Sequence, residues 1–108
     1  MVTEDQIQIQ IVGELRYAGR AVFWHTPNSG KVSKRAASRR KSMGVLAGVP
    51  DLIFLHSPMR AIELKTDRGR LSDSQKELLP LLRSYGWEVE VCHGLEEARM
   101  VCRDWGYL

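Results

Sequence analysis

The chain lacks the features that mark several classes of protein. It has only two cysteines in 108 residues. Cys92 lies in a strand pattern and Cys102 in a helical one, so both are expected to be reduced core residues, and their spacing with His93 matches no zinc signature. No apolar run approaches the length of a membrane-spanning helix, and no basic segment leads into an apolar one at the N-terminus. We therefore expect a cytoplasmic protein with no membrane segment and no secretory signal.

The length and the charge set further bounds. The sequence has no repeat and no low-complexity tail, and its 108 residues predict a single domain, residues 1–108, with a modest core. The formal net charge of +3 and the isoelectric point near 9.1 are mildly basic. Such a charge permits binding to nucleic acid without requiring it.

The stretch from Gly48 to Lys65 predicts two short strands joined by a hairpin. Residues 52–55 are a compact apolar run, residues 56–60 supply turn chemistry, and residues 61–66 resume as a strand. Glu63 and Lys65 are two positions apart, so they project from one face of that strand. Asp51 begins the first strand, and its partner across the hairpin falls near Glu63. Two carboxyl groups and a lysine are therefore expected to converge at one end of a small sheet.

This convergence suits a site for a hard divalent cation. Two carboxylates held close together repel each other, and one takes up a proton unless a counter-ion is present. Mg²⁺ prefers carboxylate, carbonyl and water oxygens, and a lysine beside it can orient an attacking water or stabilise charge that develops on a phosphate. The alternative is a surface hairpin whose alternating charges are merely solvated, because Glu-x-Lys triplets on strands are common.

A helix is predicted ahead of the first strand. Thr3 and Gln6 form a capping-box pattern, and Gly19 marks the end of the segment. Residues 6–11 alternate as a strand does, but the cap, the length and the later apolar spacing favour a helix. Glu4 falls within the apolar arc of that helix, where it would either belong to the edge of a site or interact with the helix dipole at the surface.

Pro50-Asp51 followed by Glu63-Leu64-Lys65 resembles the PD-(D/E)xK nuclease motif. The surrounding sequence, from Glu4 to about Val91, resembles the VRR-NUC family, the virus-type replication-repair nucleases. The matching segments are 48–53, 62–66 and 69–72, with Gln75. The resemblance implies a metal-dependent, structure-selective endonuclease that hydrolyses phosphodiester bonds in branched DNA such as Holliday junctions. It also implies a homodimer, and an intracellular setting that includes virus-encoded proteins in bacterial hosts.

The resemblance assigns roles to individual residues. Mg²⁺ or Mn²⁺ would be held by Asp51, Glu63 and the backbone carbonyl of Leu64, and Lys65 would manage the water. The implied catalytic set is Glu4, Asp51, Glu63, Lys65 and Gln75. A non-catalytic or partner-activated DNA-binding module that keeps the same fold is the alternative function.

Residues 31–41 form a basic run that contains no acidic residue. Such a run is usually a solvated face, but its position ahead of the hairpin also suits contact with phosphates, and its alanines and arginines suit a short helix. Two polar residues after the first strand resemble a pair found in the family, although Asn28 is equally plausible as a turn former. The predicted DNA contacts are His25, Asn28, Lys31, Lys34, Arg35, Arg39, Arg40 and Lys41.

The remaining segments complete an α/β fold. Residues 21–24 and 87–92 are predicted strands, a helix follows Ser72, and a closing helix begins near Leu95. Gln75 lies three positions after Ser72, so it also has a full explanation as a capping-box residue. The predicted order is helix, three strands, helix, strand, helix, with a small mixed four-stranded sheet and a restriction-endonuclease-like core. Candidates for a dimer interface, all of which could equally be core, are Trp105, Tyr107, Leu108 and Trp24.

Overall fold

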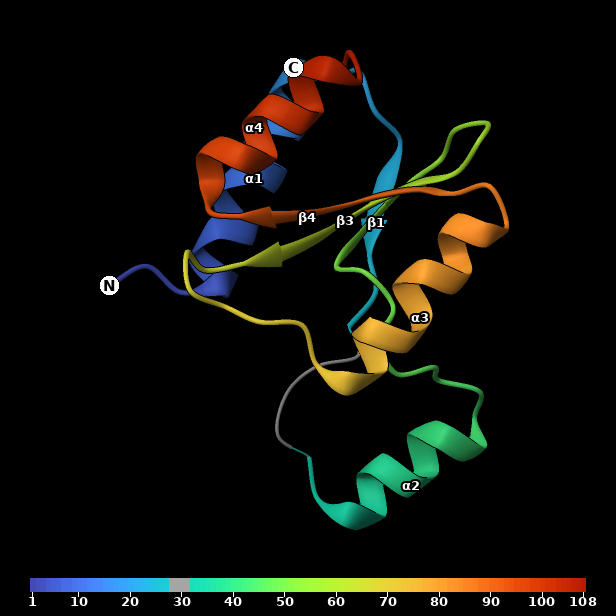
Figure 1. Ribbon diagram of the computed structural model, residues 1–108. Helices are drawn as coiled ribbons and strands as arrows, with labels where there is room; N and C mark the ends of the chain where they lie inside the picture. Colours follow the sequence, from blue (N-terminus) through green and yellow to red (C-terminus); the bar gives the residue numbers. More distant parts are fainter. Residues whose placement is uncertain (28–31) are drawn as a thin grey trace.

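The computed structural model of the chain describes residues 1–27 and 32–108. Within these residues, four helices and four strands are interspersed along the chain, and the second and third strands follow each other directly (Figure 1). In chain order they are α1 (Glu4–Ala18), β1 (Phe23–His25), α2 (Lys34–Ser42), β2 (Leu52–Phe54), β3 (Arg60–Lys65), α3 (Asp73–Ser84), β4 (Glu88–His93) and α4 (Leu95–Asp104).

The four strands form one mixed sheet in the order β1-β2-β3-β4. β1 pairs with β2 and β2 with β3 in antiparallel fashion, whereas β3 and β4 are parallel. The hairpin register pairs Leu52 with Ile62, and the parallel register pairs Lys65 with His93. Helix α3 provides the crossover that a parallel pair requires.

Helices cover both faces of the sheet (Figure 1). α1 and α4 pack against each other and against one face, where the larger apolar cluster lies. α3 covers β4 and the neighbouring part of β3 on the other face, around Ala61, Leu79 and Val89. The predicted class, a mixed four-stranded sheet flanked by helices, is confirmed. Among the described residues, no helix is long and apolar enough to cross a lipid bilayer.

The capping pattern at the start of α1 forms as predicted. Thr3 accepts a hydrogen bond from the backbone N–H of Gln6 (3.1 Å), and the Gln6 side chain accepts one from the N–H of Thr3 (2.9 Å). Ile7, Ile11 and Leu15 are buried on one side of the helix. Burying each such side chain stabilises the fold by about 1.5–3 kcal/mol, whereas Ile9, which a strand would place on the same face as Ile7 and Ile11, is 73% exposed. The helical period therefore prevails over the local alternation.

Helix α2 is an addition to the predicted order, which counted no helix between the first two strands, although the basic run had the composition of a short helix. Ser33 caps it by accepting a hydrogen bond from the N–H of Ala36 (3.1 Å). None of the nine residues of α2, all of them described, is buried. Its stability therefore depends on its cap and its composition more than on packing, so an apolar periodicity could not reveal it.

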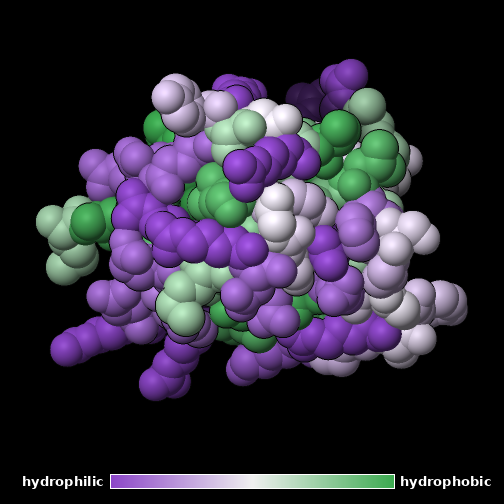
Figure 2. All heavy atoms as spheres, turned by 90° about the horizontal axis from the view of Figure 1, so that it is seen from above, coloured by the Kyte–Doolittle hydropathy of each residue, from purple (hydrophilic) through white to green (hydrophobic). Residues whose placement is uncertain are grey.

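The aromatic residues near the C-terminus are largely part of the core. The rings of Tyr107 and Trp105 lie 5.0 and 5.8 Å from the ring of Phe54, centroid to centroid, and Leu108 packs against the same cluster. The face seen in Figure 2 is mostly hydrophilic, with hydrophobic residues in small separate areas. Of the dimer candidates, Trp24 on the edge strand β1 is the one left 44% exposed.

Candidate active site

Strand β3 buries two charged side chains on the face that α3 covers. Glu63 is 2% exposed and Lys65 is 7% exposed. Lys65 Nζ lies 3.6 Å from Glu63 Oε2, while the intervening Leu64 belongs to the opposite, apolar face. The period-two argument from the sequence therefore holds. Because desolvating an ion pair costs free energy that its attraction does not always repay, a buried pair of this kind is weak evidence of stabilisation.

Asp51 lies at the open end of the β2–β3 hairpin and is hydrogen-bonded to residues of both neighbouring strands, β1 and β3. Extending the β2–β3 register by one residue places it opposite Glu63, as predicted. Its Oδ2 accepts a hydrogen bond from the backbone N–H of Leu64 (2.8 Å). Its carbonyl oxygen lies 2.8 Å from His25 Nδ1 and accepts the N–H of Thr26 at 3.4 Å. Since a carbonyl only accepts, His25 carries its proton on Nδ1.

The first turn of α3 brings Gln75 to the same place. Ser72 and Gln75 form both hydrogen bonds of a capping box, and Gln75 Nε2 also donates to Glu63 Oε2 at 2.9 Å. The structural role and the site role that the sequence left open are thus both present.

Gly48 allows the segment before Asp51 to pack on this turn. It has a φ of +90°, and a Cβ built on it would lie 2.6 Å from the carbonyl oxygen of Ser74. Only glycine combines that backbone conformation with so close an approach. The glycine therefore sets the distance between the loop that carries Asp51 and the helix that carries Gln75.

One oxygen of the buried carboxyl group has no partner. Among the described residues, nothing hydrogen-bonds to Glu63 Oε1. Burial, followed by the charge of Asp51, raises the pKa of Glu63 to about 8, whereas Lys65 opposes the rise. The charge of Glu4 adds a smaller contribution in the same direction, so this exposed residue at the start of α1 acts on the site electrostatically.

The donor set fits a hard cation. Asp51 and Glu63 offer carboxylate oxygens, and the unpartnered Oε1 of Glu63 is an acceptor that a cation would satisfy. No group of three His, Cys, Asp or Glu side chains suited to a metal occurs within residues 1–27 and 32–108. A cation here would therefore take its other ligands from backbone carbonyl, water or phosphate oxygens, which Mg²⁺ and Mn²⁺ accept and structural zinc does not.

Six of the eight predicted DNA contacts lie among the described residues, and all six are exposed. Lys34, Arg35, Arg39, Arg40 and Lys41 are all exposed on α2, and His25 is exposed at the end of β1. Asn28 and Lys31 lie outside the described residues. α2 therefore carries five basic residues and no acidic residue.

The sequence reasoning missed His93 as a neighbour of the site. Its ring Nε2 lies 3.1 Å from the carbonyl oxygen of Gly69, and it is the parallel partner of Lys65. The N–H of Gly94 also donates to the carbonyl of Lys65 (2.8 Å). The end of β4 thus supports the segment that follows Lys65. The only available signal was the position of His93 at the end of a strand, which becomes informative once the parallel pairing is known.

Taken together, the fold and the site define a protein of the nuclease type, with a carboxylate, a Glu-x-Lys pair and a glutamine gathered at one end of a mixed sheet. A sequence model of the VRR-NUC domain matches residues 2–96, and the chain belongs to this family. A solved structure described as a VRR_NUC domain protein is similar at 26% sequence identity, with a TM-score of 0.76. The match covers 97% of this chain and 88% of that one. A comparison with curated proteins finds no match.

Proposed function

We propose that the chain is a Mg²⁺- or Mn²⁺-dependent endodeoxyribonuclease that hydrolyses phosphodiester bonds in branched DNA such as Holliday junctions. Family membership supports nuclease chemistry in general. The observation that carries the metal dependence is the buried Glu63, which has an unpartnered oxygen and the carboxylate of Asp51 beside it. Even with Lys65 Nζ 3.6 Å from Glu63 Oε2, the pKa of Glu63 is raised to about 8, so a further positive charge would favour the ionised form of the carboxyl pair.

Each residue of the site then has a distinct part. Asp51, Glu63 and the carbonyl of Leu64 would hold the cation, which supplies charge neutralisation at the phosphate and a more acidic water when bound. Lys65 keeps a fixed positive charge beside Glu63, where charge develops on the reacting phosphate. Gln75 donates to Glu63 and so orients that carboxylate.

The remaining predicted residues act on binding and on the electrostatics of the site. Glu4 contributes negative charge that favours cation binding by Glu63. The basic residues of α2 supply a positive surface for the DNA backbone. His25 supports the backbone of Asp51 through its Nδ1, and its Nε2 would donate to a phosphate only in the imidazolium form, in which both ring nitrogens carry a proton. An intracellular location, where DNA is available and the two free cysteines stay reduced, agrees with this function.

We propose further that the active form is a homodimer. Symmetric cutting of a four-way junction needs two sites, which a two-fold dimer supplies through one self-complementary interface. Trp24 is the available aromatic candidate, because it is 44% exposed on the edge strand β1. Sedimentation that finds only monomer at micromolar concentration, together with activity linear in protein, would refute the dimer.

The central experiment compares DNA shapes and metal. A labelled four-way junction and a linear duplex of the same sequence are incubated with the protein in Mn²⁺, in Mg²⁺ and in EDTA. Nicking of the junction that needs the cation, and that exceeds nicking of the duplex, is the expected result. Binding of both DNAs with no nicking under any condition would instead favour the non-catalytic module.

A further inference from the structure

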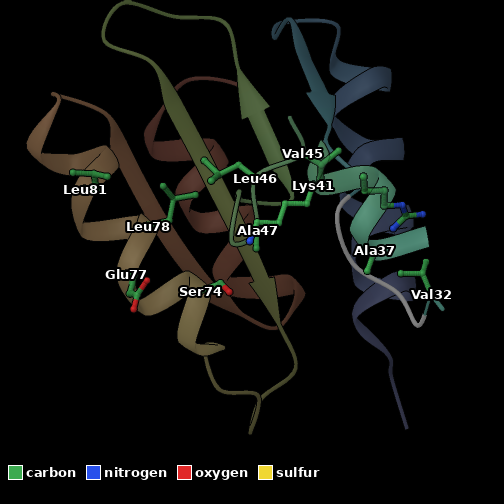
Figure 3. A pocket seen from close by; sticks show the side chains of 11 residues that line it. Val32, Ala37, Lys41, Val45, Leu46, Ala47, Ser74, Glu77, Leu78 and Leu81 are labelled. Carbon is green, nitrogen blue, oxygen red and sulfur yellow. The ribbon is translucent and has the colours of Figure 1, made fainter. Parts of the chain in front are cut away.

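A groove separates α2 from α3. Its volume is about 590 Å³, and the chain that joins α2 to β2 forms its floor. Figure 3 shows Leu78 and Leu81 on the α3 side, Lys41 on the α2 side, and the side chains of Val45, Leu46 and Ala47 between them. The lining is thus mostly aliphatic, with charged groups added from the two helices.

Several apolar side chains of this groove are exposed to solvent, although Leu78 is buried. Leu46 is 58% exposed, Leu81 52% and Val45 41%. On the α2 side of the groove, none of the nine described residues of the helix is buried. Exposed apolar residues that gather around a hollow, with charged groups at the edge, are typical of a binding site.

The charges at the edge favour an anionic ligand. Arg40 and Lys41 line the groove from a helix with five basic residues and no acid. Among the described lining residues, Glu77 is the one carboxylate. A ligand that combines a flat apolar body with negative charge matches both the floor and the edge. A second copy of the chain matches less well, because it would bring another strongly basic helix to the same place.

The groove also adjoins the candidate active site. Ser74 lines it, and the next residue, Gln75, donates to Glu63. Ala47 lines it from the other side, and the next residue, Gly48, packs against the carbonyl of Ser74. Two residues that line the groove, Ser74 and Ala47, are therefore the sequence neighbours of residues that position the site, Gln75 and Gly48.

We propose that this groove receives an unpaired nucleobase of the DNA substrate, with the adjoining phosphates at Arg40 and Lys41. The inference rests on the proposed function and names the feature that the site recognises, which is a nucleotide outside the duplex near the bond to be cut. A paired and stacked base cannot enter a side groove, whereas the base of a branch or a single-stranded tail can.

Binding measured in EDTA tests the proposal without relying on catalysis. The probe is a labelled duplex with a short single-stranded tail, compared with the same DNA whose tail carries abasic residues. Removing the bases should weaken binding to the wild-type protein by about fivefold to tenfold, at the low end of measured base contributions because none of the described lining residues is aromatic.

A matched pair of variants locates the effect. Leu81→Gln places a polar group in the groove, and Met100→Gln makes the same kind of change at a residue of α4 that is 59% exposed. Leu81→Gln should bind the intact tail as weakly as wild type binds the abasic tail, and should no longer distinguish the two. Met100→Gln should behave as wild type.

Two results would overturn the proposal. One is equal binding of intact and abasic tails by the wild-type protein, and the other is a dimer that Leu81→Gln converts to monomer, since the groove would then be an interface between copies. Either result would refute the base site. If metal-dependent nicking of the four-way junction is still observed, the proposed function is retained. Failure to bind or nick any DNA would remove both.

Discussion

Gln75 donates a 2.9 Å hydrogen bond from Nε2 to Oε2 of Glu63, which joins the first turn of α3 to the buried strand β3. The oxygen of the same amide accepts the N–H of Ser72 at 2.8 Å. Because a backbone N–H can only donate, this contact fixes which end of the amide faces Glu63. The start of a helix and a buried carboxylate are therefore oriented by one side chain.

Asp51→Asn should separate metal binding from folding. The asparagine oxygen can still accept the N–H of Leu64, which now bonds to Asp51 at 2.8 Å, while the repulsion with Glu63 disappears. We expect the metal-free variant to melt at or above the wild-type temperature. We also expect it to lose most of the stabilisation that Mn²⁺ gives wild type, about 2.7 kcal/mol at a hundredfold excess over the dissociation constant.

Melting curves with and without Mn²⁺ measure both effects, and nicking of a branched substrate should be abolished in parallel. A variant that gains as much stability from Mn²⁺ as wild type does would show that Asp51 is not a ligand.

Lys65→Met should remove catalysis while sparing binding. The change keeps the length and the apolar stem of a side chain that is 7% exposed, and removes the charge that lies 3.6 Å from Glu63 Oε2. Losing one preorganised charge beside the reacting phosphate should lower kcat on the order of a hundredfold to a thousandfold. KM and the affinity for DNA in EDTA should change little. Wild-type kcat in the variant would exclude Lys65 from the chemistry.

The metal-free protein should lose stability as the pH rises. The pKa of Glu63 is about 8 in the folded state against an ordinary value of 4.5. Between these values the folded state holds a proton that the unfolded state has released, so the free energy of unfolding falls with increasing pH. The contribution is complete below pH 4.5 and is lost by the time the pH passes 8. The total change is on the order of a few kcal/mol.

Urea unfolding in EDTA across this range measures the slope. Glu63→Gln should flatten it, whereas Glu90→Gln, at an exposed position of β4, should leave it unchanged. Equal slopes in wild type and Glu63→Gln would assign the pH dependence to other groups.

Gly48→Ala should disturb the site through packing. The added Cβ would lie 2.6 Å from the carbonyl oxygen of Ser74, whereas at Gly86 it would have nothing within 4 Å. Both glycines have nearly the same φ, +90° and +92°. Gly86→Ala therefore measures the backbone cost alone, roughly 1–2 kcal/mol. Gly48→Ala should exceed it by about 1–3 kcal/mol and weaken the Mn²⁺ response as well. Equal destabilisation by the two variants would mean that the close approach has no energetic consequence.

Arg39→Ala with Arg40→Ala should lower the salt dependence of DNA binding. If both arginines contact phosphates, the slope of log affinity against log salt should fall by about 1.8, at roughly 0.9 for each contact. Arg16→Ala in the last turn of α1, together with Arg20→Ala just after the helix, removes the same charge and serves as the control. Titrations by fluorescence anisotropy at several salt concentrations give the slopes. An unchanged slope in the α2 variant would return this helix to a solvated face.

The sequence predicted the relative placement of Asp51, Glu63 and Lys65 because local rules govern it. Alternation on one strand is enough to place Glu63 and Lys65 on the same side, and a short hairpin brings Asp51 opposite Glu63. The first helix was also predictable, because the cap at Thr3 and the burial of Ile7 and Ile11 agree on the same period. In each case the deciding interactions join residues close in sequence.

The features that escaped prediction depend on distant parts of the chain. Whether Trp105 and Tyr107 are core or surface depends on their packing against Phe54, about fifty positions away. The groove beside α3 follows from the placement of α2, which has no buried face to reveal that placement in its pattern. The role of His93 required knowledge of the parallel pairing with Lys65.

The buried carboxyl group of Glu63 links the stability of the metal-free protein to its affinity for the cation. In the metal-free protein no described residue donates a hydrogen bond to its Oε1, and burial and the charge of Asp51 raise the pKa of Glu63 to about 8, so ionising this carboxyl group in the folded state costs free energy. Cation binding would offset that same cost, by the thermodynamic cycle that joins folding and binding. Substitutions selected here for heat resistance of the metal-free protein should therefore weaken its hold on the cation in step. At this position, a gain in the thermal stability of the metal-free protein would thus be accompanied by a loss of affinity for the metal.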